Sequence, residues 1–214
     1  MTGGRVKVTA LKLQARNPAR VNVYLDGRFA FGLAKTEAVR LRVGQELTPA
    51  DIARLQAADE REQVHARALR FLAVRPRSET EVRRHLEKHK VGEAEIDQEL
   101  ARLRETGLVD DRAFARLWVE NRAAFRPRSK RALQVELKRK GIAPEAQREA
   151  LTAADDDDAL YRLAAGRARR LAALPLPEFR RKLGDFLARR GFDFDQIEAA
   201  VERAWRDIQG EADG

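Results

Sequence analysis

The chain has 214 residues, of which 43 are lysine or arginine and 34 are acidic, so its net charge is +9 at pH 7. This length suits one large domain or two to three small ones. The positive excess favours a polyanionic partner such as nucleic acid, an anionic membrane or an acidic protein surface. The absence of cysteine excludes disulfides, thiol nucleophiles and thiolate metal sites.

The N-terminal sequence MTGGRVKVTA lacks the apolar run of a signal peptide, and no stretch approaches the length of a membrane span. We therefore expect a cytoplasmic protein without a membrane partner. Aromatic residues make up only 6% of the chain, which is more typical of small helical modules than of a β-sandwich.

Residues 1–58 are predicted to form a small extension that contains a β-hairpin. The segments VNVYL and RFAFGL alternate apolar residues with others and flank the pair Asp26-Gly27, a pattern typical of two strands joined by a tight turn. The preceding VKVTALKL predicts a third strand. A short helix around Thr36–Leu41 and another helix beginning at Pro49 lead into the rest of the chain.

An internal repeat organises the rest of the chain. The tetrapeptide RPRS occurs at residues 75–78 and again at residues 126–129, 51 positions later. Leu86 and Leu137 match at the same offset, and Leu187 takes that place in a third copy about 50 positions further on. A fixed period of this length, present three times, indicates stacked modules. We predict a mainly α-helical, elongated and curved array of three tandem three-helix repeats: repeat 1 at residues 59–109, repeat 2 at residues 110–154 and repeat 3 at residues 155–214.

The RPRS corner separates the first two helices of a repeat. Pro76 ends the first helix, because the residue before a proline is pushed out of the helical conformation. Ser78 with Glu81 forms a capping box that starts the middle helix, and Ser129 has the same place in repeat 2. The expected inward positions are Val64, Ala68, Phe71, Leu72, Val82, Leu86, Ile96, Leu100 and Leu103 in repeat 1, Phe114, Leu117, Trp118, Leu133 and Leu137 in repeat 2, and Ile197, Val201, Trp205 and Ile208 in repeat 3.

Glycines end several of these helices, with Gly141 and Gly191 closing the middle helices of repeats 2 and 3. In repeat 1 the corresponding segment reads Lys90-Val91-Gly92, so the glycine is displaced and we expect a longer corner there. The four aspartates at residues 155–158 precede the first helix of repeat 3, where acidic residues favour a helix N-terminus without any metal.

The chain offers little for catalysis. Its only serines, Ser78 and Ser129, are predicted helix caps, and no glycine-rich phosphate loop occurs. His85 and His89 lie one helical turn apart with Glu81 one turn earlier, but no second cluster supplies further metal ligands. We expect no enzyme, no cofactor and no metal site.

Positive charge gathers on the predicted middle helices. Residues 126–140 hold seven basic residues and one acid, whereas residues 93–111 hold seven acids and two arginines. Long charged side chains often do no more than solvate a helix, but here the basic positions recur from repeat to repeat. We therefore predict a basic partner-binding surface. Its candidate residues are Arg75, Arg77, Arg83, Arg84, Arg126, Arg128, Lys130, Arg131, Lys138, Arg139, Lys140, Arg180, Arg181, Lys182, Arg189 and Arg190.

Three segments resemble a known family. GLVDDRAFARLWVENR at residues 107–122, ELKRKGI at residues 136–142 and KLGDFLARRGFDFDQIEAAV at residues 182–201 are similar to the RecX family of bacterial recombination regulators. The resemblance covers about residues 61–208. It implies a protein without chemistry of its own that lies in the groove of the RecA nucleoprotein filament and damps ATP hydrolysis, strand exchange and self-cleavage of the LexA repressor. It implies RecA as partner, with single-stranded DNA mainly within the filament, and we expect a monomer.

Two other functions fit the same pattern. Three-helix units with basic helices also occur in DNA-binding modules that enter the major groove, and a helical scaffold would carry the charge incidentally. The predicted middle helices offer almost only lysine and arginine, which suits phosphate or acidic protein better than the reading of base edges.

Overall fold

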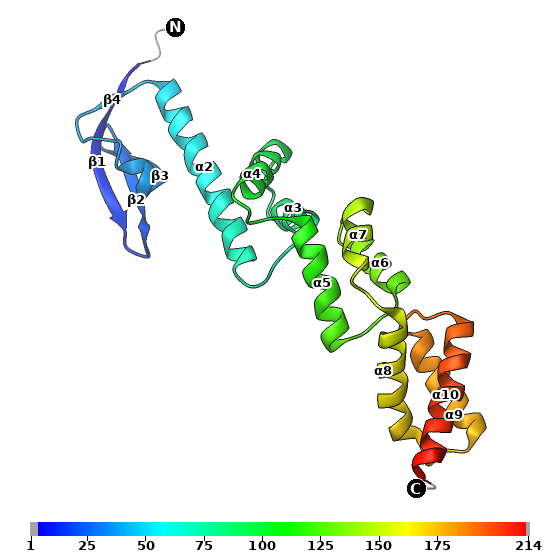
Figure 1. Ribbon diagram of the computed structural model, residues 1–214. Helices are drawn as coiled ribbons and strands as arrows, with labels where there is room; N and C mark the ends of the chain where they lie inside the picture. Colours follow the sequence, from blue (N-terminus) through cyan, green and yellow to red (C-terminus); the bar gives the residue numbers. More distant parts are fainter. Residues whose placement is uncertain (1–3, 213–214) are drawn as a thin grey trace. The chain divides into compact units, whose positions relative to one another are not determined.

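The computed structural model describes residues 4–212 and is dominated by helices (Figure 1). It divides into two compact units. Unit 1 contains the residues up to 75 together with residues 82–105, and unit 2 contains residues 76–81 together with the residues from 106 onward. None of the helices in the described part combines the length and the apolar character that crossing a bilayer requires.

The N-terminal part of unit 1 is a small antiparallel sheet in the strand order β3-β2-β1-β4. Its strands are β1 (Val6–Gln14), β2 (Asn17–Leu25), β3 (Arg28–Ala34) and β4 (Glu46–Leu47). Asp26 and Gly27 join β2 to β3 with φ angles of 49° and 82°, as a tight hairpin turn requires. The predicted hairpin and third strand are therefore confirmed, and β4 is an additional two-residue strand.

Two helices follow the strands, α1 (Lys35–Ala38) and α2 (Pro49–Leu72). Thr48 caps α2 and forms a capping box with Asp51. The helix then runs for 24 residues without a break, through residue 58, at which the extension was predicted to end. The sheet and repeat 1 thus share one helix, because no proline or glycine interrupts it.

The start of α2 covers one face of the sheet. Val8, Val23 and Leu33 are fully buried in the sheet core, and Ile52 and Leu55 of α2 pack against it. An ion pair of 2.8 Å between Arg20 of β2 and Asp59 of α2 ties the two elements further along the helix.

Repeat 1 contains the end of α2 together with α3 (Glu79–Lys88) and α4 (Glu93–Glu105). Seven of its predicted inward residues are buried, while Phe71 and Leu72 are half-buried; the buried ones are Val64, Ala68, Val82, Leu86, Ile96, Leu100 and Leu103.

The expectation of a longer corner after α3 is wrong. Lys90 has φ 60° and takes the left-handed position that Gly141 holds in repeat 2 with φ 79°. The hydrogen bond from Val91 N–H to the Leu86 carbonyl then repeats the one from Ile142 N–H to the Leu137 carbonyl. The corner keeps its length because a lysine accepts the strained backbone angle, which costs roughly 1–2 kcal/mol for a residue with a side chain.

Unit 2 holds repeats 2 and 3. Repeat 2 consists of α5 (Asp111–Phe125), α6 (Lys130–Arg139) and α7 (Pro144–Leu151), and repeat 3 consists of α8 (Asp156–Ala168), the short 3₁₀ helix η1 (Arg169–Leu171), α9 (Leu176–Ala188) and α10 (Phe194–Ala212). Helices α8, α9 and α10 lie side by side (Figure 1).

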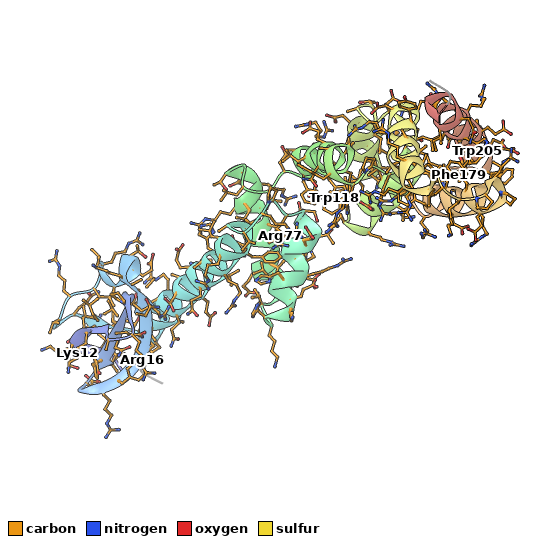
Figure 2. The ribbon with its side chains drawn as sticks, turned by 90° about the horizontal axis from the view of Figure 1, so that it is seen from below. Lys12, Arg16, Arg77, Trp118, Phe179 and Trp205 are labelled. Carbon is orange, nitrogen blue, oxygen red and sulfur yellow. The ribbon has the colours of Figure 1, made fainter. Side chains whose placement is uncertain are left out.

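Each of these repeats has its own apolar core. Leu133 and Leu137 are buried in repeat 2, and Phe179 of repeat 3 packs against Trp205 with ring centroids 4.9 Å apart (Figure 2). The prediction that Leu117 points inward is wrong, because this side chain is 51% exposed. The three predicted three-helix repeats and the β-containing N-terminal part are confirmed.

Candidate functional site

The RPRS corners start the middle helices as predicted. In repeat 1 the Glu81 N–H donates to Ser78 Oγ and the Ser78 N–H donates to Glu81 Oε2, both at 3.3 Å, which is the expected capping box. In repeat 2 the Ala132 N–H donates to Ser129 Oγ at 3.2 Å. Both serine caps are therefore confirmed.

The same hydroxyl groups also bind the following repeat. Ser78 Oγ donates to the Lys140 carbonyl at 2.7 Å, and Ser129 Oγ donates to the Gly191 carbonyl at 2.6 Å. Both bonds span 62 residues of sequence. Each corner is thus also a joint that holds the end of the next repeat's middle helix.

Aspartates from the next repeat complete each joint. Asp111 Oδ1 accepts from the Glu79 N–H at 2.8 Å, and Asp156 Oδ1 accepts from the Lys130 N–H at 2.7 Å. These N–H groups belong to the first residues of α3 and α6, which have no partner within their own helix. Burial raises the pKa of Asp111, and the nearby Glu79 carboxylate raises it further, while the backbone hydrogen bond opposes both effects.

The joints also explain the two glycines. Gly141 and Gly191 have φ angles of 79° and 94°, in the left-handed region. A Cβ atom would lie 2.6 Å from the Cβ of Thr80 at Gly141, and 2.6 Å from the Cβ of Ala132 at Gly191. Glycine is therefore required by both the backbone angle and the close approach of the preceding repeat.

The joint between repeats 2 and 3 gathers five arginines, which we call the arginine cluster: Arg122, Arg126, Arg128, Arg189 and Arg190. Four were predicted from the charge pattern, from corners and helix ends about 60 residues apart, and Arg122 of α5 was missed. The pKa of Arg190 lies below its usual value, first because the side chain is partly buried and then because the other four positive charges surround it. An anion bound here would relieve that repulsion.

One carboxylate, that of Glu136, contacts the arginine cluster. Glu136 of α6 accepts from Arg122 Nε at 2.8 Å and pairs with Arg128 Nε at 3.1 Å. It also accepts from the indole nitrogen of Trp118 at 2.8 Å, and Trp118 is labelled in Figure 2. Glu136 thus orients Arg122 and Arg128, two of the five arginines.

The other three members of the cluster carry uncompensated charge. Among the described side chains, no carboxylate pairs with Arg126, Arg189 or Arg190. Arg126 and Arg189 are exposed, and Arg190 lies over the ring of Phe186 at 5.1 Å. These three groups provide planar donors at the surface, which suit phosphate or carboxylate oxygens.

Several other predicted residues form ion pairs within the protein. Arg131 pairs with Asp193 at 3.6 Å, Arg180 with Glu202 at 3.7 Å, Arg181 with Asp185 at 3.8 Å, Lys182 with Glu178 at 3.6 Å, and Arg83 with Asp97. All of these except Arg83 and Lys182 are exposed, so their pairs contribute little.

Lys140 belongs to the joint between repeats 1 and 2. Its ammonium group pairs with Glu81 at 2.5 Å and lies 4.8 Å from the ring centroid of Trp118. Of the remaining candidates, Arg84, Lys130, Lys138 and Arg139 are exposed, while Arg75 and Arg77 at the first corner are half-buried.

The two histidines of α3 lie against an aromatic ring. The His85 imidazole stacks on Phe71 with centroids 4.0 Å apart and meets His89 edge-on at 4.8 Å. Within residues 4–212, no group of three His, Cys, Asp or Glu side chains is placed to hold a metal ion.

Four family models match the chain in order. They describe the N-terminal domain of regulatory protein RecX at residues 6–48, and the first, second and third three-helix domains of RecX at residues 65–103, 110–151 and 155–201. Regulatory protein RecX of Bacillus licheniformis is 33% identical over 200 residues, covering 91% of this chain and 76% of the relative. The chain belongs to the RecX family.

Other RecX proteins agree with this assignment. Regulatory protein RecX of Bacillus velezensis is 31% identical over 211 residues, covering 96% of this chain and 80% of the relative. A crystal structure of regulatory protein RecX superposes with a TM-score of 0.71 at 26% identity, covering 92% of this chain and 99% of the other. The resemblance to RecX expected from the sequence is therefore confirmed, and it includes the N-terminal sheet, which had not been part of it. The relatives' names support a regulatory role for this RecX-family chain.

Proposed function

We propose that the chain binds the RecA nucleoprotein filament and inhibits its ATP hydrolysis, and with it strand exchange and filament-promoted LexA cleavage, without chemistry of its own. The proposal joins membership in the RecX family with one observation, the arginine cluster at the joint of repeats 2 and 3. Arg126 and Arg189 project there without an ion pair among the described side chains.

A nucleoprotein filament offers both ligands that guanidinium groups prefer. DNA phosphates and acidic protein side chains each accept two parallel hydrogen bonds from one arginine. We assign the larger share of the binding energy to protein, since a regulator that bound any single strand equally well would be drawn away from filaments. Either ligand, phosphate or carboxylate, brings negative charge to the arginines and so reduces the repulsion around Arg190. Relief of this repulsion stabilises the bound state.

The test is inhibition of RecA ATP hydrolysis by the double variant Arg126→Ala/Arg189→Ala at two salt concentrations. Both side chains are exposed, so circular dichroism and thermal unfolding should match the wild type. The matched control is Arg148→Ala/Arg162→Ala, which removes the same charge from exposed arginines of the same two repeats. Those arginines pair with Glu145 at 3.0 Å and Asp158 at 3.4 Å.

We expect the cluster variant to require a higher concentration for half-inhibition, while the control inhibits like the wild type. Equal inhibition by both variants would make the arginine cluster a solvated surface and refute its role.

A second function, sequence-nonspecific DNA binding, is favoured by the same arginines. It predicts that the cluster variant loses affinity for naked single-stranded DNA as strongly as for the filament. It also predicts that the slope of log affinity against log salt falls by roughly 0.7 for each lost phosphate contact. If instead the filament contact is mainly with protein, naked DNA binding is nearly unchanged.

A further inference from the structure

Within the described residues of unit 1, α2 packs against one face of the N-terminal sheet. Val23 and Leu33 point to the face packed against α2, and side chains alternate between faces along a strand. The opposite face, which we call the outer face, carries Lys12, Tyr24 and Phe29 from three adjacent strands. Lys12 of β1 is labelled in Figure 2.

Two aromatic rings and a cation meet on the outer face. Tyr24 and Phe29 are paired across β2 and β3 with ring centroids 6.0 Å apart and planes at 77°. The Lys12 ammonium lies 5.1 Å from the Tyr24 ring centroid. Phe29 is 59% exposed and is not part of the sheet core, so it presents a large apolar surface to solvent.

The middle of the outer face carries two polar side chains and a glycine, which has no side chain. Gln14 Nε2 donates to Asn22 Oδ1 at 2.8 Å, and the residue opposite Asn22 on β3 is Gly32. A Cβ atom at Gly32 would lie 3.0 Å from Gln14 Nε2. A glycine inside a strand often marks a place where a ligand or another chain approaches the backbone closely.

The sheet region is strongly basic. Residues 4–48 contain nine lysines and arginines and three acidic residues. Among the described side chains, no carboxylate pairs with Lys12, with Arg16 in the turn between β1 and β2 (labelled in Figure 2), or with Arg28 at the start of β3. By contrast, Arg5 pairs with Glu46 at 3.4 Å and Arg20 pairs with Asp59. Of these unpaired cations, Lys12 lies beside the aromatic pair on the outer face, whereas Arg28 is paired with the core-facing Leu25.

We propose that the outer face of the N-terminal sheet binds single-stranded nucleic acid directly, with a base stacked on Phe29 and a backbone phosphate held by Lys12. An exposed ring next to a half-buried ring on the adjacent strand, with a cation beside them, suits unpaired bases, because every base offers a π-face and every nucleotide a phosphate. An acidic protein surface would use the cations but gain nothing specific from the ring pair. The site is separate from the arginine cluster, and its binding needs no recombinase.

The test measures fluorescence anisotropy of a labelled oligothymidylate of about 12 nucleotides, titrated with the full chain in the absence of RecA. Phe29→Ala is expected to weaken binding about 5-fold or more, since stacking on one aromatic side chain is worth roughly that much. Leu13→Ala is the matched control, because Leu13 is also 59% exposed but follows Lys12 in β1 and so faces the other side of the sheet. It should bind like the wild type.

Salt dependence separates stacking from charge. Lys12→Ala is expected to reduce the slope of log affinity against log salt by roughly 0.7, the value for one lost single-strand phosphate contact. Phe29→Ala should leave that slope unchanged while lowering affinity at every salt concentration. Arg5→Ala, which removes a paired cation from the far edge of the sheet, should change the slope less than Lys12→Ala.

Three results would overturn the proposal. The first is equal oligonucleotide affinity for Phe29→Ala and Leu13→Ala when both variants melt like the wild type. The second is equal affinity of the wild type for the single strand and for a blunt duplex of the same length, because stacking requires unpaired bases. The third is unchanged oligonucleotide binding by Phe29→Ala with a loss of RecA inhibition, which would make the outer face a protein contact. Since the binding assay contains no RecA, failure of the proposed function leaves its outcome unaffected.

Discussion

Ser129→Ala removes a hydroxyl that serves two repeats at once. Ser129 is 2% exposed, accepts from the Ala132 N–H at 3.2 Å and donates to the Gly191 carbonyl at 2.6 Å. Its first bond caps α6 within repeat 2, and its second bond holds the end of α9 in repeat 3. The substitution therefore tests whether the corner is a joint between repeats as well as a cap.

The expected loss of stability follows from both bonds. Replacing a serine cap by alanine costs about 1 kcal/mol. Leaving the Gly191 carbonyl without its buried donor costs about 1–3 kcal/mol more. The free energy of unfolding of unit 2 should therefore fall by about 2–4 kcal/mol, which exceeds what a cap alone explains.

Urea denaturation followed by circular dichroism measures this loss. Thr152→Ala is the matched control, because Thr152 Oγ1 donates to the Glu149 carbonyl at 2.7 Å but is exposed and lies within one repeat. Its midpoint should shift little. If the urea curve of Ser129→Ala gives a loss in unfolding free energy of no more than about 1 kcal/mol, the cap alone explains it and the joint is refuted. The Gly191 carbonyl would then be hydrated in the variant.

Three further substitutions test the core, the glycine and the buried carboxylate. Leu137→Ala should destabilise unit 2 by about 2–5 kcal/mol, because the side chain is fully buried; an unchanged urea midpoint would contradict its place in the core. Gly141→Ala should cost more than about 1 kcal/mol, because φ is 79° and the new Cβ would collide with Thr80; a neutral effect in urea would show that the joint tolerates a side chain. Asp111→Asn should raise the melting temperature at pH 7, since burial raises the folded-state pKa of Asp111 above 3.8 and so penalises its charged form. That penalty develops as pH rises from 3.8 through the raised pKa, so the gain should vanish well below pH 3.8, and a gain that persisted there would have another cause.

The local signals in the sequence predicted most of the fold. The 51-residue offset between the RPRS copies, the serine caps and the helical spacing of apolar residues placed the three repeats. The caps and the helical spacing act over a few residues, and the offset appears when the sequence is compared with itself, so all three are visible without the tertiary structure. These signals were insufficient where the burial or the backbone angle of a residue depends on what packs against it in the folded chain. Leu117 has helical spacing but is 51% exposed, and Lys90 replaces a glycine at φ 60°.

The N-terminal sheet shows the same limit. Its hairpin was readable from Asp26-Gly27, because that turn requires positive φ at both residues. Strand β4 has only two residues and pairs with β1 some forty positions away. Two residues are too few to show the alternation of apolar and polar side chains that predicts a strand. The outer face with Tyr24 and Phe29 likewise depends on the register between β2 and β3.

Sequence by itself determined the repeats, the helix caps and the excess of positive charge, because each follows from residue types and their spacing along the chain. The tertiary structure alone decided which charges act together. Sixteen basic candidates could be named from the sequence, but ion pairs within the protein engage several of them. Contact between residues about 60 positions apart brings Arg126 and Arg128 to Arg190 and adds the unpredicted Arg122. Electrostatic repulsion depends on distance in space, and only the packing of one repeat's corner against the next repeat's helix end sets that distance.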